Sequence, residues 1–144
     1  MTKLFLSVHV LAAIVAVGPV TVAASMFPAT LRRAGHDSLT TLRMLHRICR
    51  VYSAVGIAVP VFGFATASSL GVLGDTWLIA SIILTAAAAA ILGLLILPAQ
   101  DTALATAPDP GPAGRLAMLT GVFNLLWATV TVLMIIRPGS TTGV

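Results

Sequence analysis

The segment that decides the fold is WLIASIILTAAAAAILGLLIL, residues 77–97, in which no position carries a charged side chain. A helix rises about 1.5 Å per residue, so about 20 apolar residues cross the hydrocarbon core of a bilayer. Three further stretches of this kind occupy residues 4–27, 51–70 and 116–136. The sequence therefore predicts four transmembrane helices, the second with a helical extension that begins at about residue 39.

The composition indicates the same environment. Of the 144 residues, 58% are hydrophobic and 8% are charged, whereas a soluble domain is about one quarter charged. The chain is predicted to be one all-α, multi-pass membrane domain over residues 1–144. Its net charge is +4. In a membrane protein, an excess of basic residues reflects the topology and contact with anionic headgroups, so we exclude nucleic acid as a partner. The single cysteine, Cys49, excludes an intramolecular disulfide.

The basic residues divide unequally between the two sides of the predicted bundle. One side carries Lys3 and Arg137, and the other carries Arg32, Arg33, Arg43, Arg47, Arg50 and Arg115. Cytoplasmic loops hold an excess of Lys and Arg, which predicts that both termini lie outside a bacterial plasma membrane. Because the connections are short, we expect an antiparallel four-helix bundle, N-out and C-out.

The first span also has features of a cleaved signal peptide. Lys3 precedes it, and VAAS at residues 22–25 offers a small-residue cleavage pattern. We favour a retained span, because its apolar run exceeds the roughly 7–15 residues of a signal peptide and the following arginines resist export.

Small residues on the second span mark its expected contact face. They are Cys49, Ser53, Gly56, Pro60, Gly63 and Ala67. Transmembrane helices approach closely where side chains are small, so we expect Gly56 and Gly63 to touch another helix. The fourth span is expected to carry the counterpart, in Ala117, Gly121, Asn124, Ala128 and Thr131. Pro60 and Gly18-Pro19 predict kinks. Such a kink either forms a gate or a cavity, or is a common feature of transmembrane helices in which neighbouring groups satisfy the freed carbonyl.

The segment before the second span is predicted to be an amphipathic helix in the headgroup region. Leu42, Leu45 and Cys49 lie on one side, and Arg43, Arg47 and Arg50 on the other. Anionic lipid headgroups on the cytoplasmic face are the expected partners of these arginines. Residues 98–114 are predicted to form a loop, and Asp101 within it lies at the level of Arg50. We therefore expect an interfacial ion pair between Arg50 and Asp101.

Several features together resemble a known group of proteins. They are VHVLAAIVAVG at residues 8–18, a tryptophan opening the third span, LPAQ closing it, Asn124 in the fourth span, and VLMIIRP at residues 132–138. This pattern resembles a bacterial family of small four-span predicted integral membrane proteins of unknown function. More distantly it is similar to copper-resistance D type membrane domains and to the small haem-associated protoporphyrinogen oxidase type. In those, a histidine of an early helix is functional, which the resemblance implies for His9.

His9 has two interpretations. In the first, it is part of a polar knot that fixes helix register, with Thr66, Ser69, Ser81 and Thr131 at a comparable depth. In the second, it binds a cofactor such as haem b or copper. His46 lies roughly 20 Å deeper along the bundle by helix arithmetic, so the two histidines are not expected to share one haem. Met26, Met44, His46 and Cys49 are only a loose set of copper ligands, and we interpret the methionines as packing.

Enzymes and coupled transporters are disfavoured. The sequence contains no Ser/His/Asp set, HExxH, P-loop or GxGxxG motif in a suitable context. Coupling to protons or ions requires ionisable groups within the spans. The candidates for such a role are His9 and the neutral Asn124, and no acidic residue is expected within a span. The working hypothesis is a non-catalytic membrane protein without a cofactor, acting as a subunit, assembly factor or transport partner with another membrane protein or a second copy. The alternative is a haem- or copper-handling redox protein that uses His9.

Overall fold

The computed structural model describes residues 1–33, 38–106 and 110–139, and this part of the chain contains helices and no strand. Its elements are α1 (Thr2–Arg32), α2 (Ser38–Val55), α3 (Ala58–Leu70), α4 (Thr76–Ala90), the π-helix η1 (Ile91–Ile96), α5 (Leu97–Ala105) and α6 (Ala113–Ile136). They form four spans long and apolar enough to cross a membrane, Thr2–Arg32, Ser38–Leu70, Thr76–Ala105 and Ala113–Ile136. The prediction of an all-α bundle of four membrane-spanning helices is confirmed.

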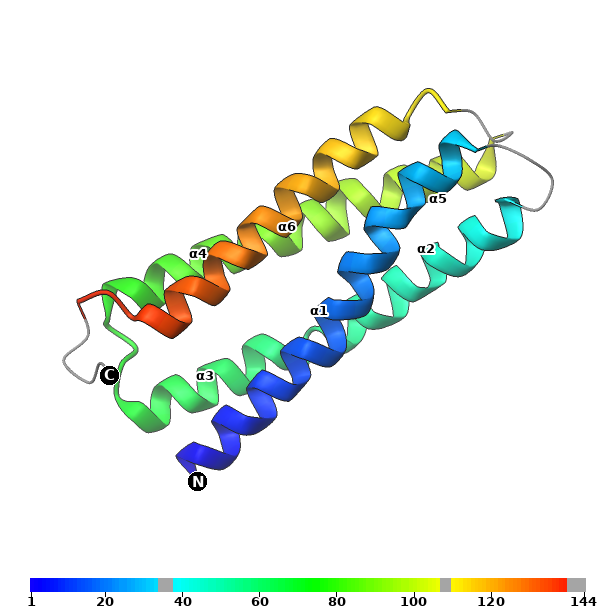
Figure 1. Ribbon diagram of the computed structural model, residues 1–144. Coiled ribbons are helices and arrows are strands. Elements are labelled where there is room, and N and C mark those ends of the chain that lie inside the picture. The colour runs from blue at the N-terminus through cyan, green and yellow to red at the C-terminus, as the bar shows by residue number, and fades with distance from the viewer. Residues whose placement is uncertain (34–37, 107–109, 140–144) are drawn as a thin grey trace.

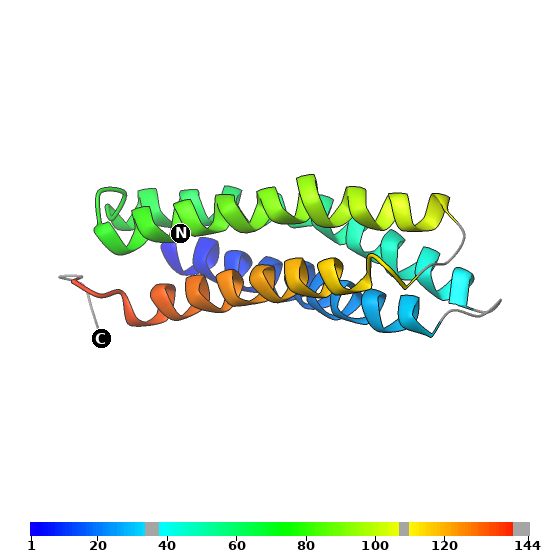
Figure 2. The ribbon, with the colours of Figure 1, turned by 90° about the horizontal axis from the view of Figure 1, so that it is seen from above.

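Successive spans run antiparallel (Figure 1). The start of α1, the α3–α4 turn and the end of α6 lie at one end of the bundle. The other end, which we call the Arg-rich end, holds the end of α1, the start of α2, the end of α5 and the start of α6. In Figure 2, α1 and α6 form one layer and the second and third spans form the other. α1 packs against α2, α3 and α6, and α6 also packs against α4.

The largest apolar cluster lies toward the Arg-rich end. It joins all four spans through Ala23, Ala24, Phe27, Leu31, Leu42, Leu45, Cys49, Ala103, Ala113 and Leu116. A second cluster, centred on Ile96 and Phe123, continues it toward the middle of the bundle. Buried polar groups near these clusters are therefore held in fixed positions, because the surrounding side chains are closely packed.

The second span is interrupted in its middle, as Pro60 predicts. Pro60 has no N–H to donate to the Gly56 carbonyl, and that oxygen instead accepts the Val59 N–H at 3.1 Å. Ile57 likewise donates three residues back, to Ala54 at 3.2 Å. α2 ends at Val55 and α3 begins at Ala58 for this reason. The kink expected at Pro19 produces no such interruption, since α1 continues as one helix through it.

The third span is longer than predicted. The loop expected from residue 98 begins only after α5, which extends to Ala105. Pro98 removes the donor for the carbonyl four residues earlier, and the chain accommodates it with the wider turn of η1, in which Leu97 N–H bonds to Leu92 O. The buried positions Leu92, Ile96 and Gln100 follow at four-residue spacing. In a regular α-helix, residues four apart are rotated by about 40° around the helix axis. The wider turn of η1 reduces this rotation, so the three side chains stay on one face.

Candidate functional site

His9 is buried between α1 and α3. Its Nδ1 lies 2.7 Å from the carbonyl oxygen of Val59, in the first turn of α3. A carbonyl only accepts hydrogen bonds, so Nδ1 carries the proton and, in the neutral ring, Nε2 keeps its lone pair. The imidazole therefore joins the first span to the second just beyond the Gly56–Ile57 interruption.

Glycine makes room for this ring. A Cβ atom added at Gly63 would lie 2.9 Å from Cε1 and 3.1 Å from Nδ1 of His9. One added at Gly56 would lie 3.8 Å from the Cβ of Ala16. Both glycines thus face α1, and Gly63 permits the contact between the His9 ring and the backbone of α3.

The polar knot predicted around His9 is wrong in its partners. Thr66 donates to Phe62 O at 2.8 Å, Ser81 to Trp77 O at 2.8 Å, and Thr131 to Trp127 O at 3.0 Å. Each hydroxyl is satisfied by the carbonyl one turn earlier in its own helix. Ser69 and Thr131 are also exposed. Depth along the bundle was a poor guide because it says nothing about the direction in which a side chain points.

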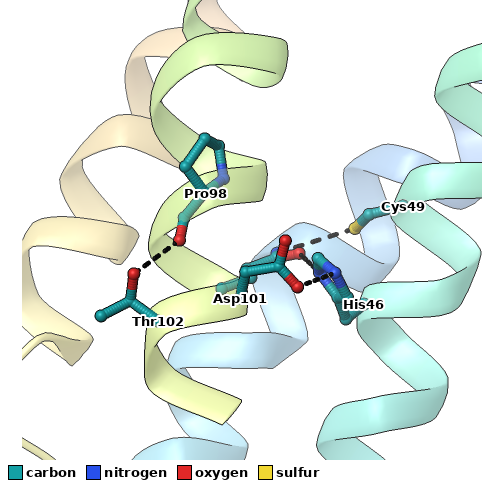
Figure 3. A network of polar contacts seen from close by, with 6 residues as sticks. His46, Cys49, Pro98, Asp101 and Thr102 are labelled. Atoms are coloured by element: carbon teal, nitrogen blue, oxygen red, sulfur yellow. Dashed lines mark hydrogen bonds and ion pairs between the residues drawn. The ribbon is translucent and has the colours of Figure 1, made fainter. Parts of the chain in front are cut away.

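A second polar cluster lies at the Arg-rich end, between α2 and α5 (Figure 3). His46 Nδ1 donates to Gln100 Oε1 at 2.9 Å, and Gln100 Nε2 donates to Cys49 Sγ at 3.7 Å. The other ring nitrogen, Nε2, lies 3.0 Å from Asp101 Oδ1. That contact is an ion pair when the imidazole is protonated, and it lacks the alignment of a hydrogen bond. Gln100 has no exposed surface, whereas the Asp101 side chain is 67% exposed.

The expected ion pair between Arg50 and Asp101 is therefore wrong in its basic partner, because Asp101 contacts His46. Asp101 belongs to α5, where a loop is predicted from residue 98, and this helix turns it toward the His46 ring of α2. A sequence signal for His46 existed, because it is four residues after Leu42 and three before Cys49, on the apolar side of α2. Gln100 was missed because the helix was not expected to continue through Pro98.

A third polar contact joins α1 to α6 and faces outward. Asn124 Nδ2 donates to Ser25 Oγ at 3.3 Å, and Ser25 is exposed. Within the described residues, Asn124 Oδ1 and Thr21 Oγ1 are buried without a hydrogen-bond partner. The expectation that Asn124 and its stripe pack against the second span is wrong, since α6 packs against α1 and α4.

Around this pair lie exposed residues of α1 and α6, most of them with small side chains, which we call the α1/α6 face. Its exposed members are Gly18, Val22 and Ser25 on α1 and Gly121 and Ala128 on α6. A Cβ atom added at Gly18 or Gly121 would meet no atom within 4 Å. Packing among the described residues therefore explains neither glycine.

The residues that the structure describes contain no group of three or more His, Cys, Asp or Glu side chains placed to hold a metal ion. Comparisons with protein-family models, with curated proteins and with solved structures gave no match.

Proposed function

We propose that this chain is a non-catalytic subunit of a larger complex in a bacterial plasma membrane, with both termini outside. Its α1/α6 face docks against a partner helix within the bilayer. The observation that supports this most is the exposed Ser25 hydroxyl of α1, which is bonded to the half-buried Asn124 at the middle of α6.

The argument rests on the cost of polar groups in lipid. The Ser25 hydroxyl faces outward and accepts a hydrogen bond from Asn124, whose own amide oxygen is buried without a partner among the described residues. Polar side chains at this depth are costly against acyl chains and are used as contacts between helices. The open glycines on either side, Gly18 and Gly121, permit the close backbone approach that such contacts need.

Photo-crosslinking tests the docking face. A photoreactive amino acid at Val22 is expected to give one adduct of fixed mass in cell membranes, because Val22 lies beside Ser25 on the α1/α6 face. Asn124→Leu is expected to reduce its yield roughly tenfold, the effect of losing 1–2 kcal/mol of interhelical bonding. Mass spectrometry of the adduct distinguishes a second copy from another protein.

The matched control is the same photoreactive residue at Leu94 on the third span, which is 73% exposed. That position is expected to crosslink to lipid without a discrete protein adduct. Equal protein adducts from Val22 and Leu94, or a Val22 adduct indifferent to Asn124→Leu, would contradict docking through this face.

One observation favours the second candidate, a haem- or copper-handling protein. Histidines that bind metals commonly donate their other ring N–H to a backbone carbonyl, which fixes the tautomer. His9 has this arrangement, since Nδ1–H is bonded to Val59 O and the neutral ring keeps a lone pair on Nε2.

An absorbance spectrum of the purified protein separates the two candidates. The subunit proposal expects no Soret band from protein made in haem-sufficient cells and no spectral change in His9→Ala. A Soret band at one haem per chain that disappears in His9→Ala would instead establish the second candidate. Metal analysis of the same samples extends the test to copper.

A further inference from the structure

A hollow lies on the surface of α2 near the Arg-rich end. Its volume is about 420 Å³, and His46, Arg47, Arg50, Val51 and Ala54 line it. The docking face lies on α1 and α6, so this hollow belongs to a different surface of the bundle.

The lining of the hollow changes from charged to apolar along the axis of α2. The two arginines occupy its outer part, while Val51 and Ala54 are exposed apolar positions further along α2. About 20 residues fill the hydrocarbon core, and the apolar part of this span, residues 51–70, accounts for them. Arg47 and Arg50 therefore lie at the depth of lipid phosphates, and Ala54 lies about 10 Å deeper than Arg47, among acyl chains.

The two guanidinium groups are free to bind an anion. In the part of the chain that the structure describes, neither Arg47 nor Arg50 has a carboxylate within ion-pair distance. The described carboxylate of Asp101 contacts His46 and is not part of the lining. Guanidinium groups bind phosphate through paired, charge-assisted hydrogen bonds.

We propose that this hollow binds one anionic phospholipid, with its phosphate between Arg47 and Arg50 and an acyl chain along Val51 and Ala54. This proposal is more specific than a general attraction of basic residues to headgroups, because it names one binding site and two arginines. Arg43 is also exposed on the same helix, but it does not line the hollow and lies about 10 Å further out than Arg50.

Native mass spectrometry of the purified full chain, titrated with phosphatidylglycerol in detergent, measures this binding. Wild-type protein is expected to retain one lipid per chain. Arg47→Gln and Arg50→Gln are each expected to weaken binding about tenfold, the effect of losing a hydrogen bond to a charged group. Arg43→Gln removes the same charge from the same helix and is expected to leave the affinity unchanged.

Two further binding measurements identify the ligand. Phosphatidylcholine is expected to bind at least about tenfold more weakly than phosphatidylglycerol, and millimolar inorganic phosphate is expected not to displace the lipid. Ala54→Leu keeps every charge and fills the apolar part of the hollow, so it is expected to weaken lipid binding. Thermal unfolding of each variant in detergent checks that the bundle is intact.

Three outcomes would overturn the proposal. An Arg43→Gln variant that loses as much affinity as Arg50→Gln would indicate diffuse attraction. Displacement of the lipid by inorganic phosphate would indicate a site for free phosphate. Equal affinity for phosphatidylcholine would show that the site does not select an anionic headgroup. None of these outcomes bears on the α1/α6 face, whose test uses other residues.

Discussion

Replacing Gly63 with leucine is expected to lower the free energy of unfolding by about 1–3 kcal/mol, the usual cost of adding volume to a packed core. The first added carbon alone would lie 2.9 Å from Cε1 of His9. The ring cannot retain its 2.7 Å contact with Val59 O and also make room for that carbon. A lowered midpoint of thermal unfolding in detergent is the measurement.

Two controls isolate the His9 contact. Gly93 is exposed on the third span, and a Cβ atom added there would meet nothing within 4 Å, so Gly93→Ala is expected to leave stability nearly unchanged. Gly63→Ala is expected to be less damaging in a His9→Ala background than in the wild type, because the clash is then absent. Equal losses in the two backgrounds would show that Gly63 faces something other than the imidazole.

The spans themselves were predictable because hydropathy over 20 residues depends on composition alone. The residue at which a span begins or ends depends on local backbone hydrogen bonding, which hydropathy does not describe. Pro98 predicts the end of a helix, because proline has no N–H to donate and its ring clashes with the preceding turn. The π-helix η1 lets the chain continue, and a wider turn of this kind has no clear signature in the residues Ile91–Ile96.

The polar contacts were less predictable than the spans. Gly63 could be identified as a close contact because only small residues permit one in a membrane. The partner of His9 could not, since it is a backbone carbonyl, and every residue has one. His46 was assigned to the headgroup level, but its ring contacts Gln100 and Asp101 of α5, a helix that was predicted to be a loop. The errors at the His46 cluster therefore follow from the error at Pro98.

The second large effect is expected from Gln100→Leu, which should cost about 1–2 kcal/mol of unfolding free energy. Leucine fills a similar volume and leaves the Nδ1–H of His46 without its acceptor at a position from which solvent is excluded. An unsatisfied buried donor costs more than the hydrogen bond contributed, although polar contacts in membrane bundles fall toward the lower end of the range. Chemical or thermal unfolding in detergent measures the loss.

The buried and the exposed partner of His46 can be separated by comparison. Asp101→Asn removes the ion pair through a carboxylate that is 67% exposed, and such pairs contribute about 0–1 kcal/mol. In a His46→Leu background, Gln100→Leu is expected to be nearly neutral, because both polar partners are then gone. If Asp101→Asn cost more than Gln100→Leu, or if Gln100→Leu cost the same with and without His46, the amide would not be what holds α5 against α2. The stability of the Arg-rich end would then depend on the apolar cluster around Leu45 and Ala103 alone.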